Sequence, residues 1–165
     1  MSRIGTFADD DLAGWFVKSP DIGAALGAFS QAVYTKNRLP LRTRELARAV
    51  IAHRNECVVC VNTRDEDGPP PAASHVVISI RNVRRPTWPG YSEQERLAAE
   101  FADRFATDHT GLRDDEDFWS HCAEHFSGEL LADLTLSCAL WVGMGRVLRT
   151  LDIEQACKLT IPSRG

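Results

Sequence analysis

The chain has 165 residues, 44% of them hydrophobic, with a formal net charge of −4 and a pI of about 5.7. This length permits one well-buried core and is short for two ordinary domains, so we expect a single domain over residues 1–165. Lys and Arg are scattered rather than clustered, which argues against a nucleic-acid or anionic membrane surface. A small-molecule or protein partner is expected instead.

The N-terminus, MSRIGTFADDDLAG, carries acidic residues where a signal peptide would need an apolar stretch. No run of residues reaches the roughly eighteen apolar positions that a membrane span requires. We therefore expect a cytoplasmic protein. Its five cysteines, an odd number in a reducing compartment, argue against a framework of structural disulfides.

The first half of the chain is predicted to form helices. Apolar residues recur at helical spacing over residues 9–17 and 22–35, and strong helix formers fill residues 43–53. Asn55 and Glu56 interrupt this pattern, and a new helix is expected at Cys57.

A proline-rich segment follows. Pro69, Pro70 and Pro71 cannot continue a helix, because each lacks an amide proton and clashes with the preceding turn. Residues 75–80 could form a short strand, but a single strand has no partner for pairing. We expect an irregular excursion over about residues 67–90.

The second half returns to helices. Ser92 and Glu95 have the spacing of a capping box ahead of an apolar helical pattern, and residues 114–126 form a further amphipathic stretch. Ser127 can cap a long last helix that runs to about Leu151. Its apolar positions alternate spacings of three and four and predict a packing seam: Leu131, Leu134, Cys138, Trp141, Gly145 and Leu148.

Cys57 and Cys60 are separated by two residues, which leaves three interpretations open. They can form a redox pair, because unpaired amides at a helix start favour the reactive thiolate. They can bind zinc together with His121 and His125, a ligand set of suitable types but with a gap of some sixty residues. They can also be inert core thiols, which is the interpretation we favour for Cys122, Cys138 and Cys157.

Glu45 and His53 are further candidates on the helix before the cysteines. Glu45 shares a stripe with Ala49 and Ala52, whose small side chains would let another helix approach and partly bury the carboxylate, so that it could relay protons. The alternative is an exposed glutamate paired with its neighbouring arginines. His53 projects toward the apolar side, where a packing role competes with that of a base.

The segment LPLRTRELARAVIAHRNECVVCVNTR resembles the signature of the carboxymuconolactone decarboxylase and alkyl hydroperoxidase D-like (AhpD-like) superfamily. In that signature an arginine and a glutamate begin a helix, a break with an asparagine follows, and C-x-x-C opens the next helix. The twelve residues from Glu45 to Cys57 match it. The segments YSEQERLAAEFADRFA and FWSHCAEHFSGELLADLTLSCALWVGMGRV resemble later helices of the family, so the resemblance covers about residues 20–150 without the excursion.

This resemblance implies an all-α, AhpD-like helical bundle that forms a homo-oligomer. We expect no cofactor and no metal. It implies a thiol-disulfide oxidoreductase or peroxidase that acts on a hydroperoxide or disulfide and is regenerated by a thiol reductant protein. Carried onto matching positions, Cys60 is the attacking thiol, Cys57 the resolving thiol and Glu45 part of the proton relay.

Two positions depart from the peroxidase signature, which has histidines where this chain has Val59 and Arg64. Arg64 can stabilise a thiolate by its charge but cannot shuttle protons, so we expect weak peroxidase activity, with His53 the first candidate for a substitute base. Two alternatives are a carboxymuconolactone decarboxylase-like enzyme, whose branch generally lacks C-x-x-C, and a non-catalytic helical domain whose C-x-x-C packs or binds metal.

Overall fold

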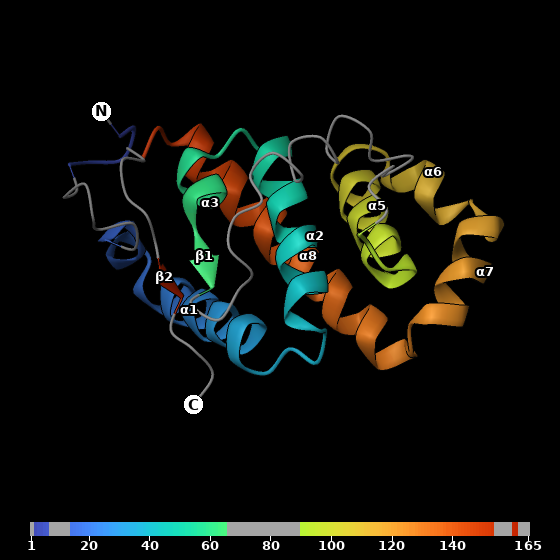
Figure 1. Cartoon of the computed structure of the whole chain (residues 1–165). Helices are drawn as coiled ribbons and strands as arrows, with labels where there is room; N and C mark the ends of the chain where they lie inside the picture. Colours follow the sequence, from blue (N-terminus) through green and yellow to red (C-terminus); the bar gives the residue numbers. More distant parts are fainter. Residues whose placement is uncertain (1, 7–13, 66–89, 154–159, 162–165) are drawn as a thin grey trace.

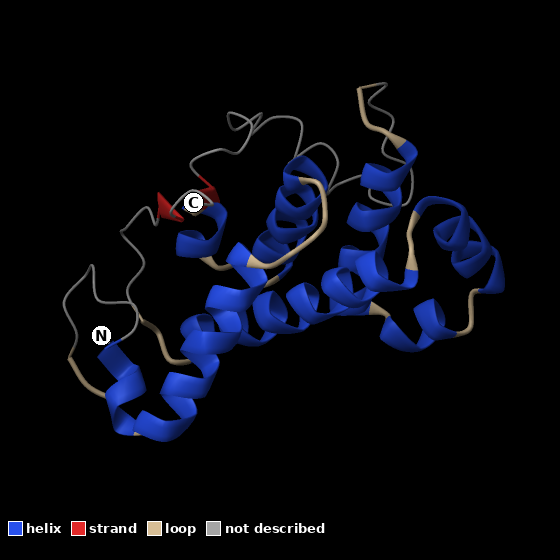
Figure 2. Ribbon diagram, turned by 90° about the horizontal axis from the view of Figure 1, so that it is seen from below, coloured by secondary structure: helices blue, strands red, loops and turns tan. Residues whose placement is uncertain are grey.

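The computed structural model describes residues 2–6, 14–65, 90–153 and 160–161. Its described part is helical apart from two short strands (Figure 2). The elements are the 3-10 helix η1 (Gly14–Lys18), α1 (Pro20–Thr35), α2 (Leu41–Arg54), α3 (Val58–Asn62), α5 (Glu93–Thr107), α6 (His109–Arg113), α7 (Glu116–His125) and α8 (Gly128–Thr150). β1 (Arg64–Asp65) pairs in parallel with β2 (Thr160–Ile161), two residues each. The predicted all-α class is confirmed.

Helix α2 lies at the centre of the described structure, in contact with α3, α5 and α8 (Figure 1). Residues 43–52 of α2 are all buried, and Leu46, Val50 and Ile51 enter the main hydrophobic core. Such complete burial is ordinary for alanine and valine but exceptional for the charged residues that this helix also carries. These buried charges distinguish α2 from a helix that only packs.

Local sequence signals set most helix boundaries as predicted. The Ser92 hydroxyl accepts a hydrogen bond from the Glu95 amide at 3.2 Å, and the Glu95 carboxylate accepts one from the Ser92 amide at 2.8 Å. Ser127 caps α8 in the predicted way, its hydroxyl accepting from the Leu130 amide at 3.3 Å. The predicted helices over 22–35 and 43–53 and the break at Asn55 are also confirmed.

Three predicted segments differ from the structure or lie outside it. Of the helix expected over residues 9–17, the structure describes only the part from Gly14, as a 3-10 helix. The stretch 114–126 begins its helix at Glu116, because the Asp115 side chain caps it by accepting from the Phe118 amide at 3.0 Å. The irregular excursion expected over 67–90 lies almost wholly outside the described residues.

Helix α8 carries the predicted packing seam and corrects one expectation. Leu134, Cys138, Trp141 and Leu148 are buried along it. By length and composition alone α8 could cross a membrane, contrary to the prediction that no such run exists. Its buried seam nevertheless packs against α2 as the core helix of a globular fold does.

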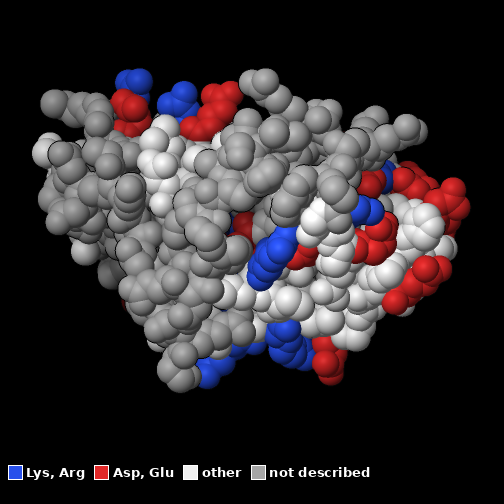
Figure 3. All heavy atoms as spheres, viewed as in Figure 1, with Lys and Arg blue, Asp and Glu red and all other residues white. Residues whose placement is uncertain are grey.

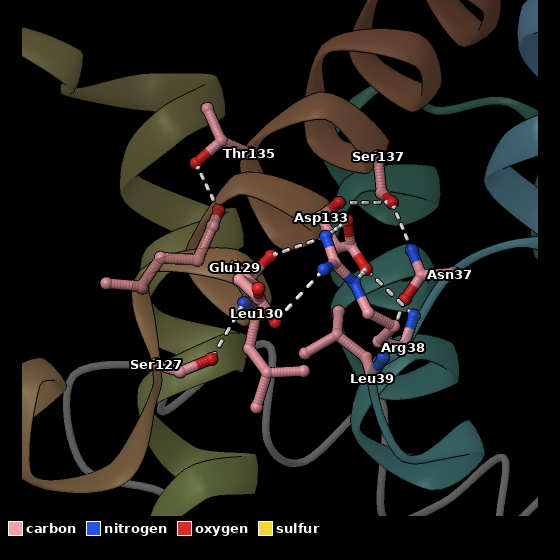
Figure 4. Close-up of polar contacts among 10 residues, drawn as sticks. Asn37, Arg38, Leu39, Ser127, Glu129, Leu130, Asp133, Thr135 and Ser137 are labelled. Carbon is pink, nitrogen blue, oxygen red and sulfur yellow. Dashed lines mark hydrogen bonds and ion pairs between the residues drawn. The ribbon is translucent and has the colours of Figure 1, made fainter.

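The connection between α1 and α2 is fixed to α8 by a polar cluster (Figure 4). Two guanidinium nitrogens of Arg38 donate to the two carboxylate oxygens of Asp133, each at 2.9 Å, and the Arg38 amide donates to the same group at 2.8 Å. The Asn37 side-chain amide donates to the Ser137 hydroxyl at 2.7 Å. These bonds anchor the start of α2 and so help to place the charged residues that follow.

Charge is unevenly distributed over the described surface. On the face shown in Figure 3, acidic side chains gather at the end formed by α6 and α7, and the Lys and Arg side chains in view form no broad patch. This distribution agrees with the acidic net charge and with the absence of a basic stripe from the sequence.

Candidate functional site

The two cysteines of the C-x-x-C motif are joined by a disulfide at the start of α3, with their Cα atoms 5.2 Å apart. Cys57 is the residue that caps α3, and its sulfur accepts a hydrogen bond from the Cys60 amide at 3.3 Å. Immediately before it, Glu56 adopts a left-handed conformation (φ 52°), which ends α2 and redirects the chain. The pair therefore occupies the helix start that the sequence predicted.

Asn55 holds this break against α8. Its side-chain amide donates to the carbonyl oxygen of Trp141 at 3.0 Å. Close approach is possible because Gly145, one helical turn later, has no side chain; a Cβ there would collide with the Asn55 amide. The position of the cysteine pair thus depends on a contact between residues far apart in the sequence.

The two cysteines differ in exposure. Cys57 is completely buried, together with the apolar side chains of Leu148 and Ile153, whereas Cys60 is half-buried at the edge of this cluster. Thiol-disulfide exchange requires the incoming thiolate to reach a sulfur atom. Cys60 is therefore the member of the pair that an external thiol or a substrate can approach.

Glu45 is buried in α2, with 8% of its surface exposed. One carboxylate oxygen, Oε2, accepts a hydrogen bond from Nε of Arg48 at 3.0 Å. The other, Oε1, is buried and accepts no hydrogen bond within the part of the chain that the structure describes. The interpretation of Glu45 as an exposed surface glutamate is wrong, and the prediction of a partly buried carboxylate is confirmed.

Arg48 connects this carboxylate to the cysteine helix. It is 4% exposed, and it donates to the carbonyl oxygen of Cys60 at 2.6 Å and to that of Thr63 at 2.8 Å. Sequence reasoning treated Arg48 only as a surface partner of Glu45. The available signal was the i,i+3 spacing of the pair on a helix otherwise dominated by small and apolar residues.

Further polar groups lie near the Glu45–Arg48 ion pair. Arg44 is fully buried and donates to the carbonyl oxygen of Tyr34 at 3.0 Å. The Tyr34 hydroxyl accepts a hydrogen bond from the Trp141 indole at 3.1 Å. Burial raises the pKa of Tyr34, while the positive charge of Arg48 opposes that rise. Tyr34 therefore lies within electrostatic reach of the Arg48 side chain.

The structure places the two accessory candidates differently. His53 is half-buried in the last turn of α2, two turns beyond Glu45 and on the same helix. Arg64 follows α3 in strand β1, but the surroundings of its side chain lie outside the described residues. The thiolate-stabilising role of Arg64 stays a prediction.

The zinc interpretation is wrong for the ligands proposed. Both cysteine sulfurs are used by the disulfide, and His121 and His125 are exposed on α7, at the opposite end of the molecule from α3 (Figure 1). Among the described residues, no group of three or more His, Cys, Asp or Glu side chains is arranged to hold a metal ion.

The cysteines expected to be structural are buried where the structure describes them. Cys122 and Cys138 are free thiols in the main core. Burial raises the pKa of Cys122 to about 12, and burial likewise raises the pKa of Cys138. Cys157 lies outside the described residues.

The sequence matches no protein-family model and no curated protein sequence. A similar solved structure is the crystal structure of an Agrobacterium tumefaciens protein of unknown function, suggested to be the antioxidant defence protein AhpD. The match has a TM-score of 0.60 at 20% identity and covers 84% of this chain and 92% of that one. The chain has an AhpD-like fold.

The AhpD-like fold confirms the architecture expected from the C-x-x-C signature. At 20% identity the match concerns the path of the backbone. The chemistry of this particular AhpD-like chain has to be argued from its own disulfide, Glu45 and Arg48.

Proposed function

We propose that this protein is a cytoplasmic thiol-disulfide oxidoreductase with weak hydroperoxide-reducing activity. The observation that carries the proposal is the Cys57–Cys60 disulfide, which pairs a buried sulfur with a half-buried one at the start of a helix. The AhpD-like fold of a suggested antioxidant protein supports the same class of chemistry.

The disulfide corresponds to the oxidised end of the cycle. A reducing thiolate attacks the sulfur of Cys60, because Cys57 is buried. The S–S bond breaks, a mixed disulfide forms on Cys60, and Cys57 leaves as a thiolate that accepts the hydrogen bond of the Cys60 amide. A second thiol of the reductant then displaces Cys60, which yields the dithiol protein and an oxidised reductant.

The oxidative half begins with the reduced pair. The Cys60 thiolate attacks the terminal oxygen of a hydroperoxide, the O–O bond breaks, and the departing alkoxide takes up a proton. The resulting sulfenic acid condenses with the Cys57 thiol and releases water. We assign the movement of protons to Glu45, whose buried carboxylate oxygen Oε1 accepts no hydrogen bond among the described residues. Arg48 ties this carboxylate to the Cys60 carbonyl but, as an arginine, does not relay protons itself.

We propose weak activity toward hydroperoxides because two groups that could deliver the proton are missing. Val59, which stands just before Cys60, is 1% exposed and apolar. Arginine at position 64 stays protonated at any ordinary pH. Disulfide exchange needs no proton delivery to an alkoxide and is expected to be the faster reaction.

Two variants, each lacking one cysteine of the pair, test the assignment of roles. Reduced Cys57→Ser, treated with a small aromatic disulfide, should form a stable mixed disulfide on Cys60. The matched variant Cys60→Ser should react at least about tenfold more slowly, because the thiol of Cys57 is buried. Equal rates, or no mixed disulfide in either variant, would contradict the proposal.

A further inference from the structure

We infer that Arg48 is a positioning residue whose charge, balanced by Glu45, sets how readily the cysteine pair forms a thiolate. This inference rests on the redox function proposed above. It adds to it a residue that the C-x-x-C signature does not include.

The geometry gives Arg48 a fixed place. Each of its three guanidinium nitrogens donates a hydrogen bond: Nε to the Glu45 carboxylate, and the two terminal nitrogens to the Cys60 and Thr63 carbonyl oxygens. The guanidinium is planar and cannot lose its proton, so these bonds hold a permanent positive charge against the backbone of Cys60 itself.

Burial makes this charge effective. Arg48 and Glu45 are both more than nine-tenths buried, and charges in such surroundings interact more strongly and are screened less by salt than charges in water. A positive charge beside Cys60 favours the thiolate, while the negative charge of Glu45 opposes it. The two residues therefore act on the thiolate with opposite signs although they share one ion pair.

These opposite signs distinguish an electrostatic role of Arg48 and Glu45 from a structural one. Arg48→Gln and Glu45→Gln break the same ion pair. If that pair had only a structural role, both variants would shift the pH midpoint of thiol alkylation in the same direction. If the charges matter, removing Arg48 disfavours the thiolate and removing Glu45 favours it. Arg44, Tyr34, the half-buried His53 of α2 and the Glu56–Arg149 pair at 3.8 Å are unchanged in both variants.

The test is the pH profile of alkylation of the reduced full-length protein, followed at Cys60 by peptide mass. The midpoint should move to higher pH in Arg48→Gln and to lower pH in Glu45→Gln. At a fixed pH below the wild-type midpoint, we expect alkylation to slow about three- to tenfold in the first variant and to quicken in the second. Arg149→Gln, which removes an exposed charge near the same break, is the matched control and should shift the profile little.

Equilibration with a dithiol buffer measures a second quantity, the ratio of dithiol to disulfide at Cys57 and Cys60. The equilibrium should favour the disulfide more in Arg48→Gln than in wild type, and a tenfold change corresponds to about 30 mV for a two-electron couple. If Arg48→Gln does not fold, the double variant Glu45→Gln/Arg48→Gln replaces it, because it removes both members of the Glu45–Arg48 ion pair together. Its alkylation midpoint should return from the Glu45→Gln value toward wild type.

The inference is overturned if both single variants shift in the same direction, if neither shifts, or if the double variant keeps the Glu45→Gln midpoint. A different result would defeat the underlying function: wild-type protein whose cysteine pair does not cycle between dithiol and disulfide. The two failures are distinguishable, since wild-type cycling is measured without any variant.

Discussion

At the scale of single residues, the site is defined by differences in burial. Cys57 and Cys60 are three positions apart, yet Cys57 is buried and Cys60 is half-buried. The sequence predicted the pair and its helix start from local signals. It could not predict that Arg48 turns toward the Cys60 carbonyl, because that contact depends on how α3 packs against α2.

The cysteine pair should also differ from the buried free cysteines. Burial raises the pKa of Cys122 to about 12. At pH 8 its thiolate fraction is then on the order of a thousandfold below that of an ordinary thiol. In reduced, folded protein treated with iodoacetamide at pH 8, peptide mapping should show Cys60 labelled well before Cys122. Denatured protein, in which both are labelled, is the control, and equal labelling in the folded state would contradict the assignment.

At the scale of elements, the contact between the α2–α3 break and α8 places the site. The capping box at Ser92 and the cap at Ser127 were predictable, because each involves residues three apart. The contact of Asn55 with Trp141 joins positions 86 residues apart, and no local sequence pattern predicts it. Likewise, no local pattern predicted the pairing of β1 with β2.

Two glycines of α8 test this contact. Gly145→Ala should destabilise the protein by about 1–3 kcal/mol, because the new methyl group displaces the Asn55 amide from its bond to Trp141. Gly143→Ala, two residues away, meets no atom within 4 Å and should stabilise by about 0.5–1 kcal/mol through helix propensity. Urea unfolding of both variants measures the difference in the free energy of unfolding. Equal effects would contradict the argument, because they would mean that the Asn55 side chain moves aside with no loss of stability.

At the scale of the whole molecule, α2 packs against both α5 and α8, and α6 and α7 pack against α5. The Arg38–Asp133 ion pair fixes the connection between α1 and α2 to α8. Arg38 lowers the pKa of Asp133, chiefly through hydrogen bonds from its guanidinium to the carboxylate. The predicted homo-oligomer and the cytoplasmic location stay predictions. Ile22 on α1 and Leu136 on α8 are exposed large apolar side chains of the kind that an oligomer interface would cover.

The Asp133 pair makes stability depend on pH in a defined direction. Because the folded-state pKa of Asp133 is lowered, its ion pair stabilises the folded protein at pH values above the ordinary pKa of an aspartate, near 4. This stabilisation is lost as the pH falls through the folded-state pKa. Asp133→Asn should lower the stability at pH 7 by about 1 kcal/mol and flatten the loss of stability in acid. Thermal unfolding between pH 7 and pH 2.5 measures this. Glu124→Gln, an exposed change on α7, should leave the acid dependence unaltered, and an unchanged profile in Asp133→Asn would contradict the argument.

The central claim is that Cys57 and Cys60 cycle between dithiol and disulfide, and peptide mass after mild peroxide treatment tests it most directly. Trypsin cleavage after Arg54 and Arg64 releases both cysteines on one peptide, NECVVCVNTR. Starting from reduced protein, this peptide should lose two hydrogens, about 2 Da, and a dithiol should restore its mass. Bound zinc at one equivalent with both thiols blocked, or an unchanged peptide while other cysteines oxidise, would contradict the account.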